Sequence, residues 1–262
     1  MIRTYALLAW TWTRAAAQYR LSFALVTLGA FVVGGLDIAV IWVIFANTDS
    51  LAGFGLAEVM LLYGASQLAF ALADLLFGNV DRISQHIRAG TLDVMLIRPA
   101  SPFAQVAADR FSPHRIGRAA QAAVVLGVAL TRLEIPLGRV WMVPVMVASG
   151  AVIFTALFTL GGALQFLLTN APEVANAFTY GGAMLNQYPL SVYDARIVRG
   201  LTFVLPLAFV NWQPGLYVLG RPDPLGLPSW TGLLSPAVAL ALAAVAALAW
   251  RAGIRRYRST GS

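Results

Sequence analysis

The 262-residue chain is too apolar for a soluble protein: 59% of its residues are hydrophobic, 11% are charged, and its mean hydropathy is +0.75. Soluble domains carry about 25% charged residues, which cover their water-facing surface. The composition therefore excludes an ordinary soluble domain, a disordered chain, a collagen and a disulfide scaffold, and it predicts an all-α integral membrane protein. The chain has no cysteine, which excludes thiol and iron–sulfur chemistry.

The first twenty residues are apolar and aromatic, punctuated by Arg3, Arg14 and Arg20. This pattern predicts a helix that lies in the membrane interface. The apolar run that follows is too long for the core of a signal peptide. Six transmembrane helices of roughly 20 residues are then predicted, at residues 21–46, 56–78, 116–131, 140–168, 174–188 and 230–250.

The arginines predict the orientation, because basic residues accumulate in cytoplasmic loops. All 18 basic residues are arginines, and the net charge is +7. With the N-terminus inside, thirteen of the 18 arginines lie on the cytoplasmic side and five lie outside. We therefore expect both termini to be cytoplasmic. The positive charge marks that face of the membrane, so no nucleic-acid partner is expected.

Residues 197–212 are apolar but contain Pro206. Two cytoplasmic termini require an even number of spans, so this segment is expected to enter from outside and return. With the proline-rich cap that follows, residues 197–229 form an external re-entrant segment in this interpretation. The alternative is a seventh span, with residues 116–131 not crossing. No repeat or linker divides the chain, so residues 1–262 are predicted to form a single domain.

Motifs for catalysis are missing from the sequence. It contains neither the GxxxxGK[ST] phosphate-binding loop nor the GxSxG nucleophile motif. His86 and His114 lack the context of a metal site. We expect no enzyme activity, no metal and no cofactor on this chain.

The most informative segment lies between the second and third predicted spans; we call residues 79–100 the connector. Apolar residues recur at helical spacing from Val80 to Ile87, and Gly90 is placed to end that helix. Thr91 can cap a second short helix. The connector is either an interfacial helix that links two spans or a docking surface for a soluble partner.

Residues 87–99, IRAGTLDVMLIRP, resemble the cytoplasmic motif of ABC-2 type transporter permeases. Tyr188-Pro189 and residues 205–214, LPLAFVNWQP, are similar to the same family. The resemblance covers most of the chain, from the interfacial helix to the arginine-rich tail.

The resemblance implies the membrane-spanning permease subunit of an ATP-driven exporter in the bacterial cytoplasmic membrane. Such permeases pair as homodimers or with a related permease, and each binds a separately encoded ATPase subunit, which holds ATP and Mg²⁺. The connector would sit in a groove of that ATPase. The residues implied in this contact are Asp81, Arg82, Gln85, Arg88, Gly90, Thr91, Leu92, Asp93 and Arg98.

Polar side chains share faces of the predicted spans. A charge at a helix centre costs about 2.5–3.5 kcal/mol, so such groups face protein or water. The translocation-path candidates are Asp37, Tyr63, Gln67, Asp74, Thr155, Thr159, Asn176, Tyr180 and Gln187. Hydrogen bonding between helices is the alternative for each. For Asp37 the expected contact is a cationic substrate or a structural partner such as Arg196 or Arg199.

Two other function classes stay open. An ion- or proton-coupled secondary transporter needs no ATPase, and paired carboxylates at one depth would favour it. Asp37 and Asp74 are instead predicted at different depths. A non-transporting membrane anchor predicts an apolar bundle interior. A neighbouring ATPase gene would favour the exporter over both.

Overall fold

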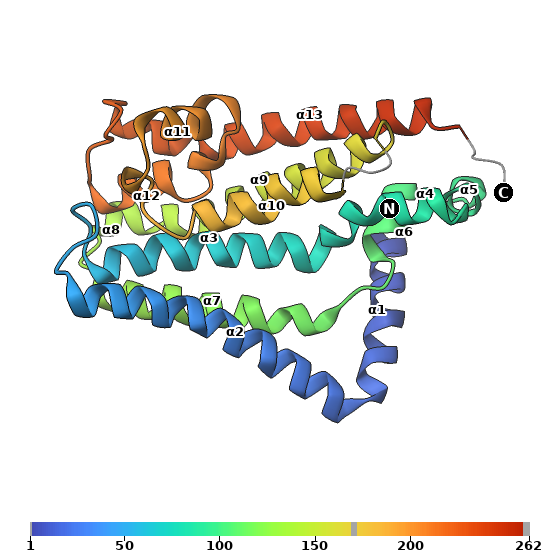
Figure 1. Cartoon of the computed structure of the whole chain (residues 1–262), viewed down its shortest axis with the longest axis horizontal. Coiled ribbons are helices and arrows are strands. Elements are labelled where there is room, and N and C mark those ends of the chain that lie inside the picture. Colours follow the sequence, from blue (N-terminus) through green and yellow to red (C-terminus); the bar gives the residue numbers. More distant parts are fainter. Residues whose placement is uncertain (1, 169–171, 259–262) are drawn as a thin grey trace.

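The computed structural model describes residues 2–168 and 172–258, and the regular elements of this part of the chain are helices. The N-terminal helix α1 (Ile2–Gln18) lies across one end of a helical bundle (Figure 1), in the orientation expected of an interfacial helix. The helices that run along the bundle are α2 (Arg20–Asn47), α3 (Leu56–Phe77), α7 (Ile116–Arg132), α9 (Met142–Gln165), α10 (Pro172–Leu185) and α13 (Ser235–Arg256).

Short elements cover both ends of the bundle (Figure 1). At the end crossed by α1, the chain from α3 to α7 forms η1 (Gly78–Arg82), α4 (Ile83–Arg88), α5 (Thr91–Ile97), α6 (Pro102–Ala108) and η2 (Pro113–Arg115). At the opposite end lies α8 (Leu137–Val140). The chain from α10 to α13 forms η3 (Leu190–Val192), α11 (Ala195–Arg199), η4 (Gly200–Val204), η5 (Leu207–Phe209), α12 (Trp212–Leu219) and η6 (Ser229–Leu234).

Four helical segments of the described chain are long and apolar enough to cross a membrane: Arg20–Asn47, Leu56–Arg88, Leu137–Gln165 and Ser229–Arg256. Helices α7 and α10 run beside them but have 17 and 14 residues, about 26 and 21 Å at 1.5 Å per residue. The protein is therefore a multi-pass membrane protein, and its described residues contain four candidate spans, or five if the bent pair described below is one. Six spans stay a prediction.

The segment around Pro206 is broken, as its sequence predicts. Residues Ala195–Val204 and Leu207–Leu219 form two helical stretches bent by 81°. Proline lacks the amide hydrogen that would continue the helix, so the chain turns there. By apolarity and length the bent pair could be one further span or a re-entrant loop. The re-entrant interpretation therefore stays a prediction.

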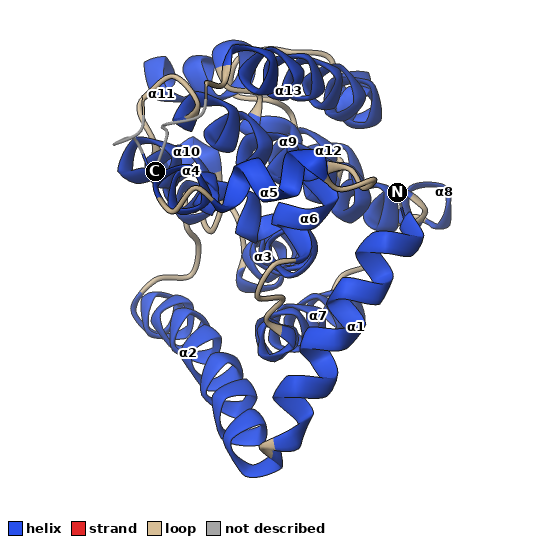
Figure 2. Ribbon diagram, turned by 90° about the vertical axis from the view of Figure 1, so that its right-hand side faces the viewer, coloured by secondary structure: helices blue, strands red, loops and turns tan. Residues whose placement is uncertain are grey.

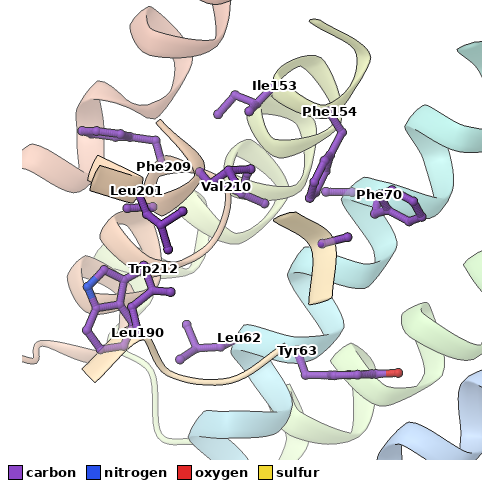
Figure 3. Packing of buried hydrophobic residues seen from close by; sticks show 14 of the residues in the cluster. Leu62, Tyr63, Phe70, Ile153, Phe154, Leu190, Leu201, Phe209, Val210 and Trp212 are labelled. Atoms are coloured by element: carbon purple, nitrogen blue, oxygen red, sulfur yellow. The ribbon is translucent and has the colours of Figure 1, made fainter. Parts of the chain in front are cut away.

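The largest hydrophobic cluster joins α3 and α9 to the broken segment (Figure 3). The rings of Phe70 and Phe154 meet edge to face, with centroids 5.2 Å apart. Trp212, from the start of α12, is 1% exposed, and its ring packs at a tilt of 51° against that of Phe54. In Figure 3 the Tyr63 hydroxyl points away from the other labelled side chains, toward the polar contacts described below. The broken segment is thus packed into the bundle.

Helix α2 lies at the edge of the bundle and packs mainly on α7 (Figure 2). Only Gly34 and Ile41 of this 28-residue helix are buried. Several of its apolar side chains, such as Leu36 and Val43, are more than half exposed. Lipid or another protein must cover this face in a membrane.

A glycine sets the distance between α3 and α7. A Cβ atom at Gly64 would lie 2.8 Å from the backbone nitrogen of Leu126. We therefore expect Gly64→Ala to push the helices apart and to lower the free energy of unfolding by about 1–3 kcal/mol. Thermal unfolding of the purified chain in detergent measures this. Gly127→Ala is the control, because a Cβ there meets nothing within 4 Å. Equal unfolding temperatures for both variants would contradict the close packing.

The cysteine-free chain allows the re-entrant prediction to be tested directly. Single cysteines at Arg196 and Pro224 flank the broken segment, and Leu137, 93% exposed, marks the same end of the bundle. If the segment returns, a membrane-impermeant maleimide added to intact cells labels all three positions. If it crosses, Arg196 and Pro224 label from opposite sides. Gln85→Cys, at the other end, is the control that labels only after permeabilisation.

Candidate functional site

The apolar side of the connector is anchored in the bundle. Val80, Ile83, Ile87 and Leu92 are at most 3% exposed and belong to one cluster with Trp250 of α13. This face follows the predicted helical spacing. The connector is therefore a fixed part of the fold.

Gly90 separates the two connector helices. Its φ of +65° lies in the left-handed region that glycine adopts without strain, just after the end of α4 as predicted. The prediction for Thr91 was wrong, because Gly90 occupies the N-cap position of α5 and no side chain caps the helix. The Thr91 hydroxyl instead lies 3.0 Å from Nδ1 of His86. It ties α5 to α4.

The polar side of the connector faces away from the bundle. Exposed side chains there are Arg82, Gln85, Arg88, Thr91 and Arg98. Asp93 is partly exposed and lies beside Tyr257; burial, with the help of this carboxylate, raises the pKa of the Tyr257 hydroxyl.

Two residues implied in partner contact are not at the surface. Leu92 is 1% exposed and Asp81 is 9% exposed. The apolar Leu92 side chain fills the cluster under α5, and the Asp81 carbonyl accepts a hydrogen bond from Nε2 of Gln165 at 2.6 Å. The helical pattern could not show this, because Leu92 belongs to a cluster with side chains of α6 and α13, and Asp81 is bonded to α9. Both hold the connector in place.

The same glutamine joins the connector to the end of α9. The amide nitrogen of Ser84 donates to Oε1 of Gln165 at 3.0 Å, and Gln165 is fully buried. One side chain therefore bonds the connector backbone at two points. Such paired, buried hydrogen bonds resist separation.

A cavity of about 520 Å³ opens beside the connector, bordered by α1, α4, α5 and α6. Three arginines line it, Arg82, Arg98 and Arg110. Its wall also contains His86, whose Nε2 lies 3.5 Å from Asp109. The arginines outnumber this one carboxylate, so the cavity favours acidic groups.

A buried ion pair lies where α3 meets the connector. The carboxylate of Asp74 is 3.2 Å from Nη1 of Arg115 and 3.9 Å from Nη1 of Arg118. Arg115 also donates to the Asp74 carbonyl at 2.6 Å and to Oδ1 of Asn79 at 3.3 Å. Asp74, predicted as a path residue, is thus held by arginines that the sequence did not single out. Arg115 and Arg118 are three residues apart at the start of α7, which places both on one helix face. This spacing was the sequence signal that could have identified them.

Asp37 has neutral partners. Its Oδ2 lies 3.4 Å from the Tyr63 hydroxyl and 3.4 Å from Nε2 of Gln187. Neither Arg196 nor Arg199 pairs with it in the described residues, so the suggested arginine partner was wrong. Both arginines are instead exposed residues of α11. Three predicted path residues from α2, α3 and the end of α10 therefore meet.

Further polar contacts join α3 and α10. Nε2 of Gln67 donates to the Ala183 carbonyl at 3.4 Å, and the Tyr180 hydroxyl donates to Asp74 Oδ1 at 3.4 Å. Asn176 is exposed on α10. We call Asp37, Tyr63, Gln67, Asp74, Tyr180 and Gln187 the polar row. It joins the two carboxylates along one side of α3.

Thr155 and Thr159 do not belong to the polar row. Their hydroxyls donate to the carbonyls of Ala151 and Thr155 in their own helix at 2.8 Å each. Both side chains line a groove between α9 and α13 instead. Helical spacing placed them on one face, but could not show which neighbour that face meets.

These observations define a multi-pass helical membrane protein with a charged connector at one end and a polar row between its helices. The model of the ABC-2 family transporter proteins matches residues 31–261 of the chain. The chain therefore belongs to the ABC-2 transporter family, which makes it a membrane transport subunit rather than an enzyme. No curated protein and no solved structure shows a significant match.

Neutralising Asp74 tests the buried ion pair. Asp74→Asn leaves Arg115 without its nearest countercharge, and breaking a buried pair costs about 3–5 kcal/mol. We expect a clear fall in thermal stability, and a smaller fall when Arg115→Gln is added. Asp49→Asn, on an exposed loop, is the control. Additive losses in the double variant would show that the two side chains do not interact.

Proposed function

We propose that this chain is the permease subunit of an ATP-driven exporter, and that a separate ATPase subunit drives it through the connector. The observation that carries the proposal is the two-sided connector. Its apolar side is anchored in the bundle, while its arginines face away. The exposed arginines can bind a soluble partner, and the buried apolar side can transmit the partner's movement to the bundle. Family membership supports transport, and the resemblance of residues 87–99 supports the ATPase as the partner.

The connector can pass a push on to several helices. Gln165 bonds it to α9, and Asn79 bonds it to Arg115 at the start of α7. Arg115 in turn holds Asp74 of α3, whose carboxylate accepts from Tyr180 of α10. Movement of the connector therefore acts on α9 and α7 through direct polar contacts, and on α3 and α10 through Arg115. In this proposal it rearranges the polar row.

The proposed orientation puts the connector in the cytoplasm. Thirteen of the 18 arginines then lie inside, and α1 and the end of α13 lie at the same end as the connector (Figure 1). The proposed location is the bacterial cytoplasmic membrane. ATP and Mg²⁺ belong to the partner subunit; this chain transmits the movement and provides the path.

A second permease completes the proposed path. The exposed apolar face of α2 needs a cover, and the polar row runs between α2, α3 and α10 beside it. A pair of permeases, identical or related, would enclose two such rows. The secondary-transporter alternative is less well supported, because Asp37 and Asp74 have separate partners and form no carboxylate pair.

Reversing one exposed connector charge tests the docking proposal. Arg88→Glu is expected to weaken assembly with the neighbouring ATPase about tenfold or more and to abolish permease-dependent ATP hydrolysis, because the carboxylate repels acidic groups of the partner. Co-purification and an ATPase assay measure both effects. Arg132→Glu, an equally exposed position at the opposite end, is the control. Unchanged assembly and hydrolysis in Arg88→Glu would overturn the docking role.

A further inference from the structure

A lateral groove of about 660 Å³ runs between α3, α9 and α13, near the end crossed by α1. Its volume lies within the roughly 300–1,000 Å³ of small-molecule sites. The lining side chains include six alanines: Ala73, Ala151, Ala156, Ala243, Ala246 and Ala247. Alanine leaves room beside a helix where a longer side chain would fill it. The groove therefore results from the alanines of α9 and α13.

Larger side chains close the groove toward the connector. Phe103 of α6 meets Trp250 edge to face, with centroids 5.3 Å apart, and Phe77 packs on Phe103 at 5.9 Å. All three line the groove. They give it an aromatic end and an open side between α3 and α13.

The groove requires an apolar occupant along its length. Its hydroxyl-bearing residues in α9 are Thr155 and Thr159, and both hydroxyls already donate to carbonyls of their own helix. An alkyl chain therefore leaves neither of these two hydroxyls unsatisfied, whereas a polar occupant would find few free partners along α9. The groove also lies along membrane-spanning helices, where alkyl chains are the surrounding medium.

The mouth of the groove carries one positive charge. Arg251 lines it, is exposed, and takes part in no ion pair among the described residues. It lies 16 residues from the start of α13 at Ser235, about 24 Å along the helix. That distance places the guanidinium near the headgroups of one leaflet, where arginine seeks an anionic partner.

We infer that this groove binds an anionic phospholipid, with one acyl chain along the alanines and the headgroup phosphate on Arg251. The tail matches the apolar lining, and the headgroup matches the unpaired cation. The groove shares Trp250 with the connector's apolar cluster, but none of the polar-row residues lines it. The inference therefore does not rest on the proposed transport cycle.

Trp250 provides the measurement, because it lines the groove and bromine quenches indole fluorescence on contact. The full chain is placed in nanodiscs of phosphatidylcholine with increasing amounts of phosphatidylglycerol brominated on its acyl chain. The signal of Trp250 is the difference between each protein and its Trp250→Phe counterpart. We expect this signal to be quenched at a lower mole fraction of brominated phosphatidylglycerol than of brominated phosphatidylcholine.

Arg251→Gln is expected to raise the half-quenching amount of brominated phosphatidylglycerol roughly fivefold, the effect of one arginine at a membrane surface. Arg255→Gln, one turn further along the same helix and outside the groove, is the matched control. Ala247→Leu fills the groove and is expected to reduce quenching by both lipids, while Ala244→Leu, exposed but outside it, is not. If Ala247→Leu does not fold, Arg251→Gln decides alone.

Two results would overturn the inference. Equal quenching by both lipids, unchanged in Arg251→Gln, would show ordinary contact with bulk lipid. No quenching of Trp250 by either lipid would show that protein, such as a second copy of the chain, covers the groove.

Discussion

Burying a carboxylate is unfavourable unless cations and donors compensate for the lost water, and the junction between α3 and the connector is organised around that requirement. Asp74 receives Arg115 and Arg118 from the start of α7 and the hydroxyl of Tyr180 from α10. Because Arg115 also bonds Asn79, the same compensation fixes where the connector leaves the bundle. The ion pair thus determines how three helices and the connector sit together.

The bundle contains two different environments, one lined by polar side chains and one lined mainly by small apolar side chains. On one side of α3, the polar row gathers groups that hydrogen-bond across helices, as at Asp37 and Gln187. Between α9 and α13, alanines and internally bonded threonines make a groove that is mostly apolar, with Arg251 as its charged side chain. In our proposals the protein uses them for transport and for lipid binding.

Local patterns predicted the elements well. The segment predicted as a short third span, residues 116–131, is the helix α7, although its crossing of the membrane stays a prediction. The break at Pro206 divides two helical stretches. Gly90 ends α4 in the left-handed conformation that its position indicates. These features depend on residues close in sequence: apolar periodicity, a missing amide hydrogen, and a residue without a Cβ atom. Whether the broken segment crosses or returns depends on the bilayer, which no local pattern specifies.

Composition and periodicity alone determined that this chain is a helical membrane protein, and its motif indicated the family that the match over residues 31–261 confirms. Only the tertiary structure decided which neighbour each helix face meets. Thr155 and Asp74 both lie on predicted polar faces, yet Thr155 lines an apolar groove and Asp74 forms an ion pair. Leu92 is likewise not part of the surface predicted to contact the partner, because it is buried in a cluster with side chains of α6 and α13. A sequence pattern fixes the face of a helix, but the partner of that face comes from contacts far apart in the chain.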